Sequence, residues 1–385
     1  MRVVWVVPRY GREVVGGAET LARSLAGRAT PPGWRVEVAT TCALDHDTWR
    51  NERPAGAEVV DGITVRRFPV SPRARGRYER LHAAVLEGRA TYLDEVEWLA
   101  QSVWSEELER WLEDDDHDLA ILCPYLFGTT VWGTLADPDR AAVLPCLHDE
   151  PYARLETVRR MLAAARGCVF NAPAEERLAR RLADVRGGGV VGMGFDPPAG
   201  PPRPGFAAER GLGEYVLYAG RLEHGKRVDV AVDHAVRYAR ERPGAPRLVL
   251  IGSGGYEPPA SAAGVVTRLG YMSEDDKRRA FAEALALVNP SPFESLSIVL
   301  MESWLEGTPA LVAAGSEVMR EHCEASGGGV PFASYDDYRD ALDALRADRE
   351  AARAMGRRGR EYVLDVYGWP AVARRFADVV GGLAT

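Results

Sequence analysis

The sequence predicts an α/β protein made of two doubly wound, Rossmann-like domains that face each other across a cleft. Short apolar runs alternate with amphipathic segments along most of the chain, a pattern typical of parallel sheets covered by helices. Residues 196–205 (DPPAGPPRPG) contain five prolines, which a packed element does not tolerate, and the alternation restarts after them. A chain of 385 residues is long enough for two hydrophobic cores. The proline-rich stretch is therefore predicted to link two domains, at residues 1–198 and 206–368.

The first domain is predicted to begin with a buried strand. Residues 2–7 (RVVWVV) are mostly apolar, as in strands that are buried on both faces of a parallel sheet. A glycine-containing loop then leads to an amphipathic helix at residues 18–29. Apolar side chains recur at helical spacing over residues 77–112, which predicts one long helix there. Further strands are expected at residues 34–40, 63–68, 119–123, 142–147 and 167–171.

The second domain repeats this pattern, and a last helix is expected at residues 369–385. In open α/β sheets, ligands bind beyond the carboxyl ends of the strands, so functional residues are sought there. Strands are expected at residues 215–218, 247–251, 265–269, 285–289 and 310–313, and helices at residues 228–240, 274–284 and 298–306.

The composition excludes several classes of protein. A formal net charge of −8 gives no overall positive field, so no nucleic-acid partner is expected. The five cysteines show no C-x-x-C spacing, which argues against a disulfide framework or a structural zinc site and favours a reducing compartment. Neither a signal peptide nor a membrane-spanning run is recognisable, so a cytoplasmic location is expected.

The strongest chemical signal lies in residues 288–312 (VNPSPFESLSIVLMESWLEGTPALV). Glu294 follows a predicted buried strand at the carboxyl edge of the sheet, and Glu302 lies eight residues later in a helix. A carboxylate so placed can accept protons from two hydroxyl groups and thereby hold a diol such as ribose. The alternative, which the residue types leave equally open, is a turn carboxylate and a solvated helical carboxylate. The start and end of this helix involve Ser295, Leu296, Ser297, Ile298 and Gly307, with Ser295 or Ser297 as the expected cap and Gly307 as the expected stop.

A second signal lies in residues 215–226 (YVLYAGRLEHGK). A predicted strand runs into Gly220, and Arg221 and Lys226 follow in or near the turn before the next helix. Backbone amides at a helix start, together with two cations, suit a diphosphate group. The alternative is a surface turn with two solvated cations.

Two weaker signals lie in the first domain. Gly16 and Gly17 follow the first strand and open the first helix, where a backbone without side chains lets a ligand approach closely. They do not form a G-x-G-x-x-G pattern, so no dinucleotide site is predicted. His148 follows an apolar run at the expected carboxyl end of another strand, which suits a functional histidine, although a structural histidine is the more common case.

Together these segments resemble the retaining glycosyltransferases of family four, which have the two-domain GT-B fold. Glu294 and Glu302 match the E-x7-E motif of that family, within surroundings that also match. The other matches are Arg221 and Lys226 to its G-R-L-x-x-x-K segment, Gly16-Gly17-Ala18-Glu19 to its N-terminal glycine loop, and His148 to its histidine near the transferred sugar. The end of the chain is similar to the family's last helix, which crosses back to the N-terminal domain.

The sequence departs from the family pattern at two places. Arg227 stands where the family often has glycine, and Ser295-Leu296-Ser297 replaces a more common Gly/Pro-Phe-Gly. The second departure affects the selection of the sugar rather than the class of enzyme.

The resemblance implies transfer of a sugar from a nucleotide-sugar, UDP-linked more than GDP-linked, to a hydroxyl group of a saccharide, a lipid or a small molecule. The N-terminal domain would bind this acceptor and the C-terminal domain the donor. Glu302 would hold the ribose, and Glu294, His148, Arg221 and Lys226 would act in catalysis. The remaining donor-binding residues would be Gly16, Gly17, Gly220, Ser295, Leu296, Ser297 and Ile298.

Neither a metal nor a cofactor is expected. Asp114-Asp115-Asp116 resembles a D-x-D metal motif, but it belongs to an acidic run that is expected to be solvated. The arginines between residues 73 and 89 could contact an anionic membrane or a phosphorylated acceptor, although a solvated helix face is the simpler interpretation. A nucleotide-sugar epimerase, a phosphorylase of the same fold and an inactive nucleotide-sugar-binding protein stay open as alternatives.

Overall fold

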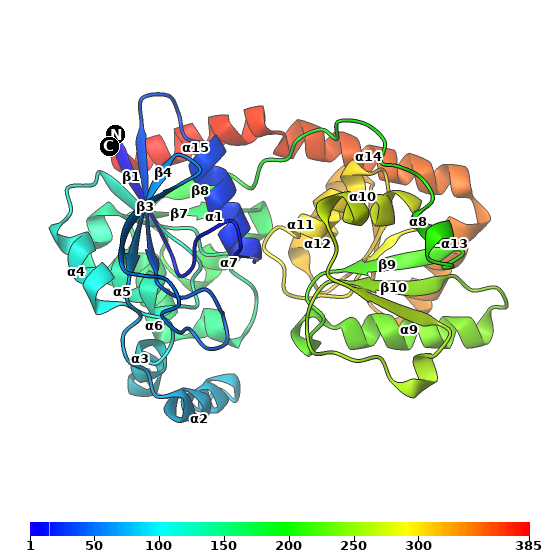
Figure 1. Cartoon of the computed structure of the whole chain (residues 1–385), viewed down its shortest axis with the longest axis horizontal. Helices are drawn as coiled ribbons and strands as arrows, with labels where there is room; N and C mark the ends of the chain where they lie inside the picture. Colours follow the sequence, from blue (N-terminus) through cyan, green and yellow to red (C-terminus); the bar gives the residue numbers. More distant parts are fainter. Residues whose placement is uncertain (15) are drawn as a thin grey trace. The chain divides into compact units, whose positions relative to one another are not determined.

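The computed structural model describes residues 1–14 and 16–385, which form two compact units (Figure 1). Unit 1 comprises Met1–Gly194 and Trp369–Thr385, and unit 2 comprises Phe195–Gly368. Each unit is built on one largely parallel sheet with helices packed against it, which confirms the predicted α/β class. Over the described residues, none of the helices combines the length and the apolar character needed to cross a membrane.

Unit 1 contains an eight-stranded sheet in the order β3-β4-β2-β1-β5-β6-β7-β8. Neighbouring strands are parallel, except that β3 pairs antiparallel with β4 at one edge. The strand order changes direction between β1 and β5, so a topological switch point lies beyond their carboxyl ends. The strands are β1 (Arg2–Val7), β2 (Arg35–Thr41), β3 (Gly56–Val60), β4 (Ile63–Phe68), β5 (Leu119–Leu122), β6 (Ala141–Val143), β7 (Gly167–Phe170) and β8 (Gly188–Val190).

The helices of unit 1 bury apolar side chains against this sheet, whose central strands β1 and β5 are almost fully buried. They are α1 (Gly17–Arg28), α2 (Arg75–Leu86), α3 (Tyr92–Ala100), α4 (Glu106–Asp114), α5 (Gly128–Ala136), α6 (Glu156–Ala164), α7 (Pro173–Leu182) and α15 (Trp369–Ala384), with the short 3-10 turns η1 (Pro138–Arg140) and η2 (Pro151–Arg154).

The single helix predicted over residues 77–112 is wrong, because the chain forms α2, α3 and α4 there. Gly88, with φ of 66°, follows α2 in the left-handed region. Thr91 and Asp94 form a capping box that starts α3, and the Ser105 hydroxyl caps α4. These signals are present in the sequence, but the apolar spacing continues through them and conceals the breaks.

The C-terminal helix α15 packs on unit 1, against β8 and α1 (Figure 1). Phe376 is buried and stacks on Trp5 of β1, with ring centroids 6.1 Å apart. The Arg28 guanidinium lies over the Trp369 ring at 4.3 Å from its centroid. These aromatic contacts hold α15 on unit 1.

Unit 2 contains a six-stranded parallel sheet in the order β11-β10-β9-β12-β13-β14. Its switch point lies between the central strands β9 and β12. The strands are β9 (Tyr215–Ala219), β10 (Arg247–Ile251), β11 (Val266–Gly270), β12 (Leu287–Asn289), β13 (Ala310–Ala313) and β14 (Gly329–Phe332). The helices are α8 (Phe206–Glu209), α9 (Val228–Glu241), α10 (Glu274–Glu283), α11 (Ile298–Leu305), α12 (Glu317–Ser326), α13 (Tyr335–Ala347) and α14 (Arg349–Tyr367), with the 3-10 turns η3 (His224–Lys226) and η4 (Ala260–Ala262).

Three strands in the structure, β3, β8 and β14, are absent from the sequence prediction. All three lie at sheet edges. β3 is mostly exposed, β8 begins with two glycines, and β14 contains Pro331. Short edge strands without an apolar run give no periodic signal. Proline is tolerated in an edge strand because the outer side of that strand has no neighbouring strand to which its backbone must donate.

Candidate functional site

The two strongest sequence signals follow the two central strands of unit 2. β9 ends at Ala219 and continues into Gly220 and Arg221, whereas β12 ends at Asn289 and continues towards Glu294. These strands are neighbours and flank the switch point of the sheet. Ligands of open α/β sheets bind beyond the carboxyl ends of the strands at this point. The fold therefore brings together two segments that are about seventy residues apart in sequence, as the separation of 68 between Lys226 and Glu294 shows.

Lys226 and Glu294 form a direct ion pair at this point. The Lys226 ammonium donates to Glu294 Oε1 at 2.8 Å and to the Phe293 carbonyl at 3.0 Å. Their side chains are 21% and 13% exposed, so the pair is largely shielded but still reachable. The lysine is a mobile cation whose present partner is a carboxylate, and an anionic ligand can compete for it.

Arg221 is more exposed and only loosely held. Its side chain is 60% exposed, and its guanidinium lies 3.2 Å from Glu223 Oε1. The backbone of Arg221 is fixed, because its carbonyl accepts the Tyr218 hydroxyl at 2.7 Å. The structure thus anchors the main chain and leaves the guanidinium able to turn towards a ligand.

Two glycines after β10 let its loop lie directly on the β9 loop. A side chain at Gly252 would place its Cβ 1.8 Å from the Gly220 carbonyl oxygen, and one at Gly254 would lie 2.3 Å from the Leu222 oxygen. Both glycines have a positive φ, 130° and 141°, that other residues rarely adopt. The Leu222 amide donates to Ser253 at 2.7 Å across this contact. The Gly-rich loop therefore fixes the shape of the Gly220–Arg221 turn.

The helices α9 and α11, which follow the two segments, both begin at a residue with left-handed backbone. Arg227 (φ 54°) and Ser297 (φ 66°) occupy these positions. Left-handed conformations favour glycine, which explains why the related family often has glycine at both. Ser297 occupies the N-cap position of α11, as expected of Ser295 or Ser297, but its hydroxyl does not cap the helix and instead accepts the Asn289 side-chain amide at 3.1 Å.

The rest of this segment follows the expectation more closely. Gly307, with φ of 78°, ends α11 in the left-handed conformation of a C-terminal cap. Leu296 is buried, whereas Ser295 and Ile298 are partly exposed near the start of the helix.

Glu302 lies in α11 and pairs with a residue that the sequence did not indicate. The Lys277 ammonium, in the first turns of α10, donates to Glu302 Oε1 at 2.8 Å and also lies 2.8 Å from Glu274 Oε2. Burial raises the pKa of Glu302, and Lys277 opposes that rise. The pKa of Lys277 is raised in turn, because the two carboxylates outweigh its burial. Glu294 and Glu302 thus sit in two separate ion pairs, each with its own lysine.

A simple count would have pointed to Lys277. The chain has 48 lysine and arginine residues, of which only Lys226 and Lys277 are lysines. All the others of these 48 are arginines, and the two lysines pair with the two glutamates of the strongest motif. A compact ammonium and a planar guanidinium are not interchangeable at a close contact. The spacing within the motif could not reveal Lys277, because it precedes Glu302 by 25 residues.

In unit 1, the glycine pair lies after β1, beside the switch point of that sheet. Gly16 has extended backbone with φ of 175°, and Gly17 is the first residue of α1. A Cβ at Gly16 would lie 2.1 Å from Glu19 Oε2. Glu19 in turn accepts from the buried Arg9 Nε at 3.0 Å. A side chain at position 16 would therefore displace the Glu19 carboxylate from its present place.

His148 lies beyond the carboxyl end of β6, also in unit 1. Its Nδ1 is 3.3 Å from Glu150 Oε1, which accepts the Tyr125 hydroxyl at 2.5 Å. The histidine side chain is 25% exposed. The preceding amide, that of Leu147, donates to the buried Glu175 carboxylate at 2.6 Å.

Glu175 ties the loop of His148 to the next strand. Its carboxylate is fully buried and accepts the amides of Leu147 at 2.6 Å and Asn171 at 2.5 Å. Burial raises the pKa of Glu175 to about 8, although these backbone hydrogen bonds lower it. The carboxylate thus links the loop after β6, at the residue before His148, to the residue after β7.

Residues 207–362 match the family model described as "Glycosyl transferases group 1". The chain carries the sequence pattern of this family over those residues, which make up most of unit 2. It is 27% identical to a D-inositol 3-phosphate glycosyltransferase of Kribbella flavida, over 93% of this chain and 89% of that protein. It is 30% identical to a GDP-mannose-dependent alpha-(1-6)-phosphatidylinositol monomannoside mannosyltransferase of Mycobacterium tuberculosis, over 43% of this chain and 47% of that one.

Solved structures establish the fold of the chain as GT-B. Sucrose-phosphate synthase from Thermosynechococcus elongatus superimposes with a TM-score of 0.74 at 17% identity, covering 99% of this chain and 98% of that one. WaaG, a glycosyltransferase involved in lipopolysaccharide biosynthesis, gives a TM-score of 0.67 at 14% identity, over 99% and 100% of the two chains.

The acidic run at residues 113–118 is exposed at Asp114 and Asp116, as expected, whereas Asp115 is partly buried and is held in ion pairs. The Arg2 guanidinium donates to Asp115 at 2.6 and 2.9 Å and to Asp116 at 2.6 Å. His117 Nδ1 lies 3.2 Å from Asp115 Oδ2. Arg2 lowers the pKa of Asp115 against the effect of burial. The run therefore stabilises the start of β1.

The arginines between residues 73 and 89 are largely matched by neighbouring acids. Arg75 pairs with Glu79 at 2.9 Å, Arg77 pairs with Glu97, and Arg89 donates to Glu87 at 2.6 Å. The partly buried Arg73 lies over the Tyr78 ring. These contacts reduce the positive charge that the segment could offer to a membrane or a phosphorylated acceptor.

Proposed function

We propose that the protein is a retaining glycosyltransferase that moves a sugar from a nucleotide-sugar donor, UDP-linked in preference to GDP-linked, to a hydroxyl group of an acceptor. The observation that carries this proposal is the pairing of the only two lysines with Glu294 and Glu302 beside the switch point of unit 2. Cations and carboxylates in that arrangement suit an anionic diphosphate next to a neutral diol.

Arg221 and Lys226 would bind the diphosphate. Negative charge grows on the diphosphate as its bond to the sugar breaks, and fixed positive charges near it lower the barrier. Lys226 would exchange its contact with Glu294 for a phosphate oxygen, and the exposed Arg221 would turn onto the same group. The amides at the starts of α9 and α11 add to this positive field. With this charge supplied by the chain, the scheme requires no metal.

Glu302 would hold the ribose hydroxyls, with Lys277 keeping the carboxylate ionised. An ionised carboxylate accepts hydrogen bonds from two hydroxyl groups, whereas a protonated carboxyl group has less acceptor capacity. The direct contact between Lys277 and Glu302 favours the ionised form despite burial.

Glu294 would lie by the transferred sugar, and His148 stays a predicted catalytic residue of unit 1. In the proposed reaction the bond between the anomeric carbon and the diphosphate oxygen breaks, and a bond to the acceptor oxygen forms on the same face. The acceptor proton passes to a phosphate oxygen of the leaving group, and the sugar is oxocarbenium-like in the transition state. Release of Glu294 from Lys226 would place a negative charge near the sugar as positive charge develops.

Acylation of the two lysines by an amine-directed reagent tests the donor site in the unmodified protein. Lys226 and Lys277 are the only lysines of the sequence and carry its only reactive side-chain amines. We expect saturating UDP to slow the acylation of both lysines, measured by peptide mass spectrometry. We also expect UDP to protect at lower concentration than GDP. Equal acylation of the lysines with and without either nucleotide would contradict the proposal.

Transfer itself is tested by replacing the exposed arginine. Arg221→Ala should lower kcat by about 10²- to 10³-fold, the usual effect of removing one group that stabilises a developing negative charge. Arg320→Ala is the matched control, because Arg320 is a partly exposed arginine of α12 whose ion-pair partner is Glu324 on the same helix. Release of UDP from UDP-glucose, followed with a broad panel of hydroxyl acceptors, gives the rates.

A further inference from the structure

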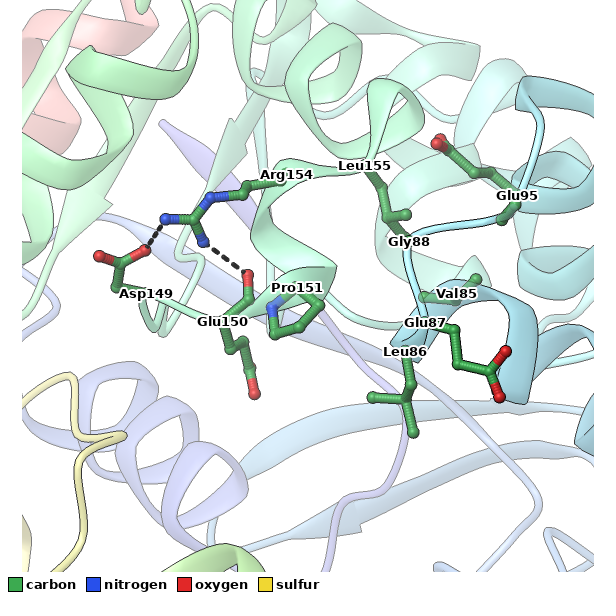
Figure 2. Close-up of a pocket in the computed structure, with 11 residues that line it drawn as sticks. Val85, Leu86, Glu87, Gly88, Glu95, Asp149, Glu150, Pro151, Arg154 and Leu155 are labelled. Carbon is green, nitrogen blue, oxygen red and sulfur yellow. Dashed lines mark hydrogen bonds and ion pairs between the residues drawn. The ribbon is translucent and has the colours of Figure 1, made fainter.

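Unit 1 contains a cavity of about 550 Å³ beside the loop that carries His148 (Figure 2). One side is formed by the end of α2 and the connection to α3, and the other by residues 149–155. The volume lies within the range of about 300–1,000 Å³ that is usual for small-molecule sites. Asp149 and Glu150, which line the cavity, directly follow His148 in the chain.

The walls of the cavity combine carboxylates with apolar side chains. Val85, Leu86, Pro151 and Leu155 supply the apolar part, and Leu86 is 47% exposed. Such a mixture fits a polyhydroxylated ring, which presents C–H groups on its faces and hydroxyl groups around its edge. The carboxylates that line the cavity are Glu87, Glu95, Asp149 and Glu150.

Arg154 is the one cation among the lining residues, and it is already bound to its neighbours. Its guanidinium pairs with Asp149 and donates to the Glu150 carbonyl at 3.2 Å (Figure 2). Arg89, next to the cavity, is likewise bound to Glu87. A phosphate group entering the cavity would therefore meet carboxylates in excess and would have to break an ion pair to gain a cation.

From this lining we infer that the cavity binds the acceptor, and that the acceptor is a polyol with no phosphate or carboxylate, favoured when it bears an amino group. The inference rests on the proposed function, because it takes the ligand beside His148 to be the hydroxyl substrate. The proposed acceptor differs in charge from D-inositol 3-phosphate, the anion after which one relative is named. Carboxylates also accept hydroxyl protons, so they hold a neutral polyol as well as an amine.

Isothermal titration calorimetry in the presence of UDP tests the charge selectivity with three probes of one ring, namely glucosamine, glucose and glucose 6-phosphate. The expected order of affinity is glucosamine, then glucose, then glucose 6-phosphate, with about tenfold or more between the first and the last. Each tenfold step equals about 1.4 kcal/mol. Tighter binding of glucose 6-phosphate, or no detectable binding of glucosamine, would overturn the inference.

Two variants show whether the cavity is the place of this selectivity. Asp149→Asn releases Arg154 and removes one negative charge. The ratio of the affinity for glucosamine to the affinity for glucose 6-phosphate should therefore fall by about tenfold. Asp139→Asn is the matched control, because Asp139 also pairs with an arginine, Arg186. Asp139 precedes β6, whereas His148 lies beyond the other end of that strand. An unchanged preference in Asp149→Asn, or an equal change in both variants, would place the selectivity elsewhere.

The titration of UDP alone separates this inference from the proposed function. Failure of UDP to bind would remove the donor site and the proposed function, whatever the probes do. If UDP binds and the order of the probes is reversed, the donor site stands and only the nature of the acceptor is wrong.

Discussion

The carboxylate of Glu302 depends on a single cation, Lys277, at 2.8 Å. Burial raises the pKa of Glu302, and this lysine limits the rise. Lys277→Met keeps the apolar stem and removes the charge, so the pKa of Glu302 should rise further. We expect UDP affinity to fall by about tenfold, or roughly 1.4 kcal/mol.

The loss in Lys277→Met should grow as the pH falls, because the carboxylate is then protonated and accepts hydroxyl protons less well. Titration of UDP at several pH values measures this. Lys277→Arg keeps the charge but not the compact ammonium, so it should recover only part of the affinity and should remove the pH dependence of the loss. A pH-independent loss in Lys277→Met would show that the lysine acts through packing alone.

The two left-handed residues at the helix starts should respond in opposite ways to glycine. Arg227 is exposed and has only a weak contact with Asp229 at 3.7 Å, so Arg227→Gly should remove backbone strain and raise the free energy of unfolding by up to about 1 kcal/mol. Ser297→Gly also removes strain, but it leaves the buried Asn289 amide without its acceptor, at a cost of about 1–3 kcal/mol. Urea denaturation measures both, and equal effects would contradict the explanation.

At the scale of elements, the turn after β9 is shaped by the loop after β10. Gly252→Ala would force a Cβ against the Gly220 carbonyl oxygen in a backbone conformation with φ of 130°. We expect a loss of at least about 2 kcal/mol in unfolding free energy, together with weaker UDP binding. Gly255→Ala, three residues later, meets no atom within 4 Å and should change stability by less than about 0.5 kcal/mol. Thermal unfolding with and without UDP tests the pair.

Glu175 of α7, which binds the loops after β6 and β7, should give the protein a characteristic pH dependence. Its pKa is raised to about 8 in the folded protein, against about 4.3 in an unfolded chain. The folded state therefore holds the proton more tightly, and this part of the stability is complete below about pH 4.3 and is lost as the pH rises towards about 8.

Glu175→Gln should flatten this decline, because glutamine does not titrate. It should also lower stability at acid pH, since one carbonyl oxygen cannot accept the amides of both Leu147 and Asn171. Glu176→Gln, a partly exposed neighbour on α7, should keep the slope of the unmodified protein. Urea unfolding at about pH 5 and pH 8 measures the slopes, and parallel curves for all three proteins would contradict the raised pKa.

At the scale of the whole molecule, the sequence was sufficient for the fold class and for most of the buried strands. Central strands of a parallel sheet are continuous apolar runs, which are visible without any structure. Edge strands such as β3 and β8 lack this pattern, and the three helices of residues 75–114 share one apolar spacing that hides their boundaries. Local sequence patterns thus predict the buried central strands, but they miss the edge strands and the helix boundaries.

The candidate site was accessible from sequence only in part. Glu294, Glu302, Arg221 and Lys226 stood out through their position after predicted strands, and they remain predictions as site residues. The pairing of Lys277 with Glu302 depends on how α10 packs beside α11, which no spacing along the chain encodes. The cavity of unit 1 likewise arises from segments about sixty residues apart, as the 62-residue separation of Glu95 and Thr157 illustrates.

The central claim is that unit 2 holds the diphosphate and ribose of the donor between Arg221, Lys226 and Glu302. A crystal structure of the protein with UDP tests it most directly. The account predicts the diphosphate within hydrogen-bonding distance of Arg221 and Lys226, with the Lys226–Glu294 contact opened and both ribose hydroxyls on Glu302. Electron density for UDP at any place away from these side chains would contradict it.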